Sequence, residues 1–182
     1  IAVPGRWTSA FLALRLFLRD EFPFVLVPFD KIQEAVLRGS YQGQAVAAGL
    51  LIHEGQLTFR QQGLHALVDL GTWWKEQTGL PLPLGGNAIR RDLGPQVIGD
   101  VHRLLRQSID YALSHRDEAL EYALGFARDL DRPLADRFVG MYVNTWTQDL
   151  GEAGREAVRL FLDRAFEVGA IPQRVRLDFV EE

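Results

Sequence analysis

The chain has 182 residues, of which 47% are hydrophobic and 24% charged, and its formal net charge is −4. This composition is typical of a soluble globular protein with one large domain or two small ones, and the mildly acidic balance argues against nucleic acid as the main partner. Because the chain has no cysteine, disulfide bonds and thiolate metal sites are excluded. No apolar run reaches the ~18–20 residues of a membrane-spanning helix, so no membrane partner is expected.

The chain begins with Ile1-Ala2-Val3-Pro4-Gly5, without an initiator methionine. It also lacks the basic and apolar segments of a signal peptide. These first residues are typical of the interior of a strand, as if the chain began in the middle of one. We therefore expect an N-terminally truncated chain, either a fragment or a processed product.

Short apolar segments predict the strands of a largely parallel sheet. The strands expected in the first part of the chain are residues 1–3, 24–29, 45–52 and 64–70, and a closing strand is expected at 174–180. Residues 40–43, just before the third strand, are predicted to form a loop.

Two helices are predicted between the first three strands. Thr8 or Ser9 suits the N-cap of the first helix, which runs through Arg19. That helix is apolar nearly all round, so we expect it to be packed on more than one side. Asp30 is predicted to cap the second helix, and Gly39 to end it.

After the strand at 64–70, residues 72–77 predict a short amphipathic turn that carries two tryptophans. Residues 80–84 are expected to be extended, because Pro81 and Pro83 forbid a helix and restrict the residues before them. A Gly-Gly-Asn sequence then interrupts this segment.

From Pro95 onward the pattern becomes helical. Pro95 suits the first turn of a helix, and an apolar stripe at i, i+3/i+4 spacing continues to Ala112. Further helices are predicted at 116–130, 133–146 and 152–168. The sequence therefore predicts an α/β fold in two parts, an α/β lobe over residues 1–92 and a mainly helical segment over 93–182.

His53 and Glu54 directly follow the predicted strand at 45–52. Open α/β sheets bind their ligands at the carboxyl ends of the strands, and histidine can exchange a proton near neutral pH. Adjacent residues on an extended segment point to opposite faces, so His53 alone is the candidate general base. The alternative is a hydrogen-bonded histidine that packs the end of a strand.

Thr8 and Ser9 follow a strand and a Pro-Gly turn at the start of a helix. Free backbone N–H groups and the positive end of the helix dipole make such a position suitable for an anion. Plain N-capping is the alternative interpretation.

Gly86 and Asn87 end a rigid Pro/Gly-rich segment close in sequence to Trp73 and Trp74. Such a segment suits the wall of an apolar cleft, and it equally suits a packed crossover. The remaining histidines have no metal-like spacing, and no phosphate-binding or dinucleotide-binding glycine motif is present. The sequence therefore gives no support for a metal site or a nucleotide site.

Six segments of the chain form an ordered set of motifs: residues 3–10 (VPGRWTSA), 51–58 (LIHEGQLT), 69–74 (DLGTWW), 78–87 (TGLPLPLGGN), 90–94 (RRDLG) and 142–144 (YVN). In this order they resemble the 1,4-dihydroxy-6-naphthoate synthase family of menaquinone biosynthesis by the futalosine pathway. The resemblance implies a two-lobed fold similar to type II periplasmic solute-binding proteins, with the active site between the lobes. Residues 1–92 would be a nearly complete second lobe, and 93–182 would belong to a first lobe whose N-terminal part is missing.

The resemblance also implies a cytoplasmic, cofactor-independent carbon–carbon lyase that converts cyclic dehypoxanthinyl futalosine to 1,4-dihydroxy-6-naphthoate. In this family the histidine that falls on His53 is the proposed proton acceptor, and the hydroxyl pair that falls on Thr8 and Ser9 contacts the substrate. Its only expected partner is the small-molecule substrate. A truncated chain could be inactive, and its exposed apolar stripes could favour a homo-oligomer.

Two other functions fit the same fold. One is a solute-binding protein that captures a small anion without chemistry, and the other is the sister enzyme chorismate dehydratase, whose relatives usually lack the HEGQ segment. A binding protein does not need an imidazole directed into the cleft, so the position of His53 distinguishes the first alternative.

Overall fold

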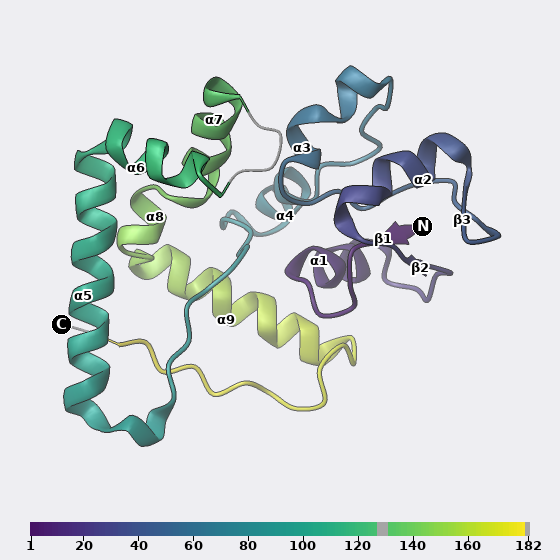
Figure 1. Ribbon diagram of the computed structural model, residues 1–182. Helices are drawn as coiled ribbons and strands as arrows, with labels where there is room; N and C mark the ends of the chain where they lie inside the picture. Colours follow the sequence, from purple (N-terminus) through teal and green to yellow (C-terminus); the bar gives the residue numbers. More distant parts are fainter. Residues whose placement is uncertain (127–130, 181–182) are drawn as a thin grey trace. The chain divides into compact units, whose positions relative to one another are not determined.

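The computed structural model describes residues 1–126 and 131–180 and has a mixed α/β, helix-rich fold with few strands (Figure 1). The chain divides into two compact units. The first consists of residues 1–85 and 156–175, and the second of 86–155 and 176–182. The first unit is therefore discontinuous in sequence, because the chain returns to it after residue 155.

The first unit contains a small parallel sheet. Strand β1 (Ala2–Val3) pairs in parallel with β2 (Val25–Leu26), with Ala2 opposite Val25. On the other side of β1, the Ala2 N–H donates to the carbonyl of Ala48 at 2.8 Å, and the Ala2 carbonyl accepts from Leu50 N–H at 2.8 Å. The first strand is thus flanked by two parallel segments, as the sequence predicts.

The expected strand at 45–52 is shorter than predicted. Only residues 48–50 follow the parallel sheet, because Ala45 pairs elsewhere. Strand β4 (Gln44–Ala45) forms an antiparallel hairpin with β3 (Ser40–Tyr41), so the predicted loop at 40–43 is confirmed only for the turn at 42–43 and is wrong for 40–41. Gln42 and Gly43 have φ angles of 47° and 79°, the positive values that two-residue hairpin turns favour.

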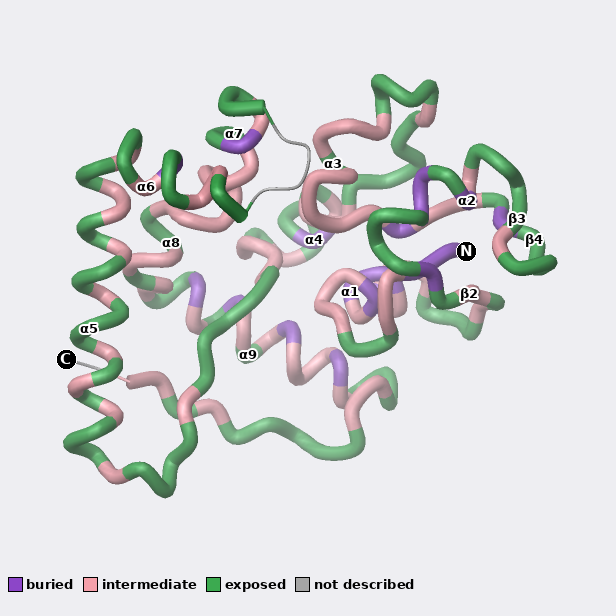
Figure 2. Tube along the Cα trace, in the orientation of Figure 1, coloured by how far each residue is buried: buried purple, intermediate pink, exposed green. Residues whose placement is uncertain are grey.

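Helix α1 (Ser9–Leu18) is buried on two sides, which confirms the expectation from its all-round apolar surface. One side contributes to a core cluster with β1, and the other to a cluster with helices α4 (Leu70–Thr78) and α9 (Gly151–Glu167). The buried members of the first cluster are Val3, Phe11, Leu14 and Leu50, and those of the second are Ala13, Leu16, Trp74 and Phe161. Figure 2 shows these buried positions on α1, β1, α4 and α9.

Helix α2 (Ile32–Arg38) follows a 3-10 turn, η1 (Phe29–Lys31). The prediction that Asp30 caps this helix is wrong, because the 3-10 turn includes Asp30 and Lys31 stands at the N-cap without a capping side chain. The helix ends as predicted at Gly39, whose φ of 70° is left-handed.

Helix α2 packs directly on the third parallel segment. A Cβ atom at Gly49 would lie 2.5 Å from Ile32 Cγ2 and 2.8 Å from Val36 Cγ2. Only glycine leaves room for this approach. The packing brings the start of α2 close to the chain that leads to His53.

The rest of the first unit contains α3 (Gly55–Thr58), η2 (Phe59–Gln62) and α4. The predicted strand at 64–70 is wrong: residues 64–69, all of them described, form no strand. Leu67 is 77% exposed, and the side chain of Asp69 instead caps α4 by accepting from Thr72 N–H at 2.9 Å. The short turn expected at 72–77 is therefore the centre of a nine-residue helix.

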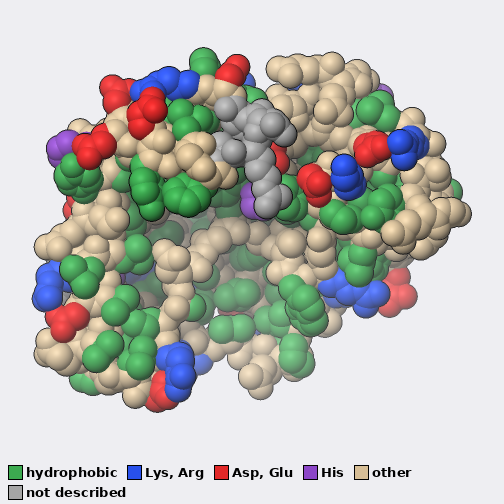
Figure 3. Space-filling model, viewed as in Figure 1, with side chains coloured by type: hydrophobic (Ala, Val, Ile, Leu, Met, Phe, Trp, Pro, Cys, Tyr) green, Lys and Arg blue, Asp and Glu red, His purple; other side chains and the backbone are tan. Residues whose placement is uncertain are grey.

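In the second unit, a 3-10 turn, η3 (Arg91–Leu93), leads into α5 (Gly94–Ser114), with Pro95 in its first turn as predicted. The apolar stripe of α5 is present but exposed, and none of the 21 residues of this fully described helix is buried. The four stripe residues Val97, Val101, Leu104 and Leu105 are 40–60% exposed. Figure 3 shows hydrophobic side chains at the surface over α5, at the left edge of the view.

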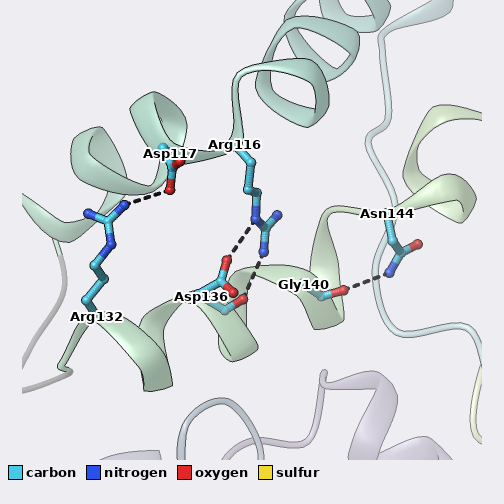
Figure 4. A network of polar contacts seen from close by, with 6 residues as sticks. All are labelled: Arg116, Asp117, Arg132, Asp136, Gly140 and Asn144. Carbon is cyan, nitrogen blue, oxygen red and sulfur yellow. Dashed lines mark hydrogen bonds and ion pairs between the residues drawn. The ribbon is translucent and has the colours of Figure 1, made fainter.

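Helices α6 (Arg116–Leu124) and α7 (Arg132–Tyr142) are joined by ion pairs (Figure 4). Arg116 Nε lies 2.9 Å from Asp136 Oδ1, and its Nη2 donates to the Asp136 carbonyl at 2.8 Å. Arg132 reaches back from α7 to Asp117 at 2.9 Å. The helix predicted at 116–130 is confirmed as far as Leu124, and its last residues, 127–130, lie outside the described residues.

The single helix predicted at 133–146 is divided in two, because α8 (Thr145–Gln148) begins anew after Asn144. Asn144 accepts from Trp146 N–H at 3.0 Å, and its own N–H donates to Thr147 Oγ1 at 3.2 Å, which forms a capping box.

Helix α9 confirms the prediction at 152–168, whereas the fully described residues 174–180 form no strand. Side chains of this last segment instead make ion pairs, Arg174 with Asp163 and Asp178 with Arg91. Throughout the described part of the chain, no helix combines the length and the apolar character needed to cross a bilayer.

Candidate functional site

The carboxyl ends of the three parallel segments lie at one edge of the first unit. Pro4 directly follows β1, and Pro28 follows β2 with one residue in between. His53 comes three positions after the last residue of the segment 48–50. This edge is where parallel α/β sheets bind ligands. The connections that carry Thr8, Ser9 and His53 therefore all leave the sheet in the same direction.

The backbone of His53 is left-handed, with φ of 53°. This conformation is uncommon for a residue with a side chain, although histidine, asparagine and aspartate adopt it more often than others. Residues held in it store strain of about 1–3 kcal/mol and cluster at functional sites. The expectation that His53 and Glu54 lie on an extended segment is wrong, because they form the turn that starts α3.

The imidazole ring of His53 packs edge-on against Phe29, with 5.0 Å between ring centroids and 68° between the planes. Phe29 comes directly after Pro28, at the end of the second parallel segment. His53 as a whole is half-buried, and the ring of Phe29 forms an apolar wall on one side of its imidazole. The sequence carries no signal for this contact, because 24 positions separate the two residues.

Glu54 contributes to the turn through its backbone. Its carbonyl accepts from Leu57 N–H at 2.9 Å and from the Thr58 hydroxyl at 3.3 Å. The carbonyl of the next residue, Gly55, accepts a hydrogen bond from the buried side-chain amide of Gln33 in α2 at 3.1 Å. The sequence reasoning missed Gln33, although a glutamine next to the apolar Ile32 at the start of this helix is a signal that it could have used.

Thr8 acts as the N-cap of α1. Its hydroxyl accepts from Phe11 N–H at 3.1 Å and donates to the Gly5 carbonyl at 3.0 Å. The hydroxyl of Ser9 donates to the Leu84 carbonyl at 2.6 Å. Both hydroxyl hydrogens therefore have partners within the unit. The first backbone N–H groups of a helix have no intrahelical acceptor, so this end of α1 suits an anion.

A hollow of about 430 Å³ lies between the turn after β1 and the end of β2. Trp7, on its rim, is 92% exposed, an unusual position for a large apolar ring. The residues that line the hollow are Pro4, Gly5, Arg6, Trp7, Leu26, Val27 and Pro28. Its wall is therefore mainly apolar and ends one residue before Phe29.

Gly86 and Asn87 are exposed and lie in the irregular segment 81–90, in which the chain passes from the first unit to the second. Their role as a cleft wall remains a prediction. Within residues 1–126 and 131–180, no three histidine or acidic side chains gather in a way that could hold a metal ion.

A family model described as menaquinone biosynthesis matches residues 1–167. The chain belongs to this family. A relative named 1,4-dihydroxy-6-naphthoate synthase, from Thermus thermophilus, is 44% identical over 164 residues, which cover 90% of this chain and 58% of the relative. A relative of the same name from Streptomyces coelicolor is 38% identical over 177 residues, which cover 94% of this chain and 61% of the relative.

The fold of the chain is similar to an X-ray crystal structure of a protein from Archaeoglobus fulgidus. The TM-score is 0.85 at 47% sequence identity, and the match covers 93% of this chain and 62% of that one. The chain thus spans about three-fifths of the length of each of these menaquinone-family relatives and of the solved structure.

Proposed function

We propose that the chain carries the activity of a 1,4-dihydroxy-6-naphthoate synthase, a carbon–carbon lyase of menaquinone biosynthesis. The substrate would be cyclic dehypoxanthinyl futalosine and the product 1,4-dihydroxy-6-naphthoate. Two relatives that carry this enzyme name, at 44% and 38% identity over most of the chain, support the proposal. The fold proposed for the protein is the two-lobed one of type II periplasmic solute-binding proteins, with residues 1–92 as most of the second lobe.

The observation that carries the proposal is the conformation of His53. A strained, left-handed histidine at the carboxyl edge of a parallel sheet, with its ring against Phe29, fits a group held for chemistry rather than for packing. In the proposed reaction the neutral imidazole of His53 removes a proton from the bound substrate and so starts carbon–carbon cleavage.

Thr8 and Ser9 are the proposed substrate-binding residues. Their hydroxyl hydrogens are already donated to the carbonyls of Gly5 and Leu84. We therefore assign substrate binding at this point to backbone N–H groups in the first turn of α1, with the hydroxyls holding that turn in place. The apolar hollow beside Trp7 would accept part of the ring system of the substrate.

The test is a His53→Asn variant of the longest natural polypeptide that contains these 182 residues. Asparagine tolerates the left-handed backbone, so the fold should be retained while the proton acceptor is lost. Loss of a general base lowers turnover about 100- to 10,000-fold. His65→Asn, which changes an exposed histidine of the same unit, is the matched control and should keep full activity. Undiminished release of 1,4-dihydroxy-6-naphthoate by His53→Asn would refute the role of His53.

A further inference from the structure

Gln33 is the one polar residue that is buried in the described part of the chain, with 9% of its surface exposed. Its side-chain amide nitrogen donates twice, to the Gly55 carbonyl at 3.1 Å and to Thr58 Oγ1 at 3.0 Å. Buried amides are retained where their hydrogen bonds hold a particular geometry, because an unpaired amide in the interior is costly. Both bonds cross from α2 to the turn that follows His53.

The two bonds continue into the backbone beside His53. The Thr58 hydroxyl, which accepts from Gln33, donates to the Glu54 carbonyl at 3.3 Å. Gln33 thus holds the carbonyls of both residues that follow His53, one directly and one through Thr58. A residue in a left-handed conformation persists only where its surroundings over-determine it, and this network fixes the chain on the C-terminal side of His53.

Residues 29–36, which include Gln33, also contact His53 and the chain before it. Phe29, three residues before the start of α2, contacts the imidazole ring. On the N-terminal side, Ile32 and Val36 pack onto Gly49, four residues before His53. Residues 29–36 therefore contact the ring, the chain before it and the turn after it.

We propose that Gln33 is a positioning residue for His53, which it holds in its left-handed conformation through the carbonyls of Gly55 and Glu54. This inference rests on the proposed function of His53 as the general base. Gln33 does not act on the substrate itself. It sets the direction in which the imidazole points, and misplacement of a reacting group by about 1 Å costs on the order of 100-fold in rate.

Two substitutions separate this role from simple packing. Gln33→Met keeps the length and volume of the side chain but has no N–H to donate. Gly55→Ala leaves Gln33 unchanged, but its new Cβ would lie 3.1 Å from Gln33 Nε2, so the amide would have to shift by a few tenths of an ångström. The backbone of Gly55 is not left-handed and alanine is the better helix former, so this second variant should fold normally.

The experiment measures kcat, KM and thermal stability in the longest natural polypeptide that contains these residues. Gln33→Met and Gly55→Ala should each lower kcat about 10- to 100-fold with KM little changed, because the base is misdirected while the binding surface remains. The double variant should lose little more than either single one, since both act through the same hydrogen bond. Phe161→Leu, a core change in contact with Trp74 in the same unit, is the stability control: it should lower Tm and leave kcat unchanged.

NMR spectra give a readout that does not depend on turnover. The ring signals of His53, assigned by their loss in His53→Asn, should shift in Gln33→Met, while those of His102 and His115 stay in place. Unchanged kcat and unchanged His53 signals in both Gln33→Met and Gly55→Ala, with His53→Asn inactive, would overturn the positioning role alone. Full activity of His53→Asn would instead overturn the proposed role of His53 as the general base, and the inference with it.

Discussion

Phe29 and His53 meet edge to face, with their ring centroids 5.0 Å apart, although they come from the connections of two different parallel segments. Phe29 is 38% exposed, so it contributes less to the core than a buried phenylalanine would. Its ring lies against one side of the imidazole. The contact therefore gives a way to disturb the proposed base without unfolding the protein.

Phe29→Ala should lower kcat on the order of 10-fold by releasing the ring of His53. Loss of an aromatic pair costs only about 0.5–1.5 kcal/mol beyond the burial of area, so the fold should survive. Steady-state kinetics together with urea unfolding test both statements. Phe29→Tyr keeps the ring and serves as the matched control. A kcat for Phe29→Ala equal to that of Phe29→Tyr would show that the contact does not orient the base.

Thr8→Val should destabilise the protein, because it removes the side-chain acceptor for Phe11 N–H at the start of α1. The loss of an N-cap costs about 0.5–2 kcal/mol, and Thr8→Ser, which keeps the hydroxyl, should cost much less. Urea unfolding curves of the two variants give the difference. If KM rises for Thr8→Val as well, the first turn of α1 also binds the substrate; equal stability of both variants would contradict the capping role.

Gly49→Ala should destabilise the first unit, since the added methyl group would meet Ile32 Cγ2 at 2.5 Å and Val36 Cγ2 at 2.8 Å. Overpacking of this kind costs about 1–3 kcal/mol. Gly99→Ala in the middle of α5 is the matched control, because, apart from its chain neighbours and the nearby backbone of its own helix, no described atom lies within 4 Å of its new Cβ. That control should be neutral or stabilising by up to about 1 kcal/mol, since alanine favours the helix. Similar Tm values for the two variants would count against the close packing of α2 on residues 48–50.

Trp74→Phe should weaken the packing between α4 and the proline-rich segment. The fully buried indole donates its N–H to the Pro81 carbonyl at 3.1 Å, and phenylalanine would leave that acceptor without this partner. An unsatisfied acceptor costs about 1–3 kcal/mol when fully buried, and less here because Pro81 is only half-buried. The measurement is the free energy of unfolding, with Trp73→Phe as control because Trp73 is only partly buried. An equal loss in both variants would mean that the Trp74 hydrogen bond adds nothing.

The pKa of Asp100 is lowered by a hydrogen bond from Gln96, with a further contribution from Arg103. A carboxyl group whose pKa is lower in the folded state stabilises the fold above its unfolded pKa. That stabilisation is lost as the pH falls through the folded value. Gln96→Ala should therefore raise the pKa of Asp100 toward its ordinary value, which an NMR titration of its carboxyl carbon measures. An unchanged Asp100 titration in this variant would show that Gln96 does not interact with it.

Local signals in the sequence predicted many of the helices and part of the sheet. Proline in the first turn of α5, glycine after α2 and a threonine before α1 each act within one turn of the chain, so their effect does not depend on the rest of the fold. The predicted strands at 64–70 and 174–180 are wrong for the complementary reason. An apolar or alternating segment becomes a strand only beside another strand, and these two have none beside them in the described residues.

The sequence by itself determined that a histidine follows a buried parallel segment and that hydroxyl residues start the helix after a Pro-Gly turn. Its ordered motifs also resembled the family to which the chain belongs. Only the tertiary structure decided how His53 is held. Its backbone is left-handed, the ring of Phe29 lies on one side, and the amide of Gln33 donates to the carbonyl of Gly55 in the turn that follows. These contacts join residues 20 or more positions apart. They arise from the packing of α2 on Gly49, which no local pattern of residues encodes.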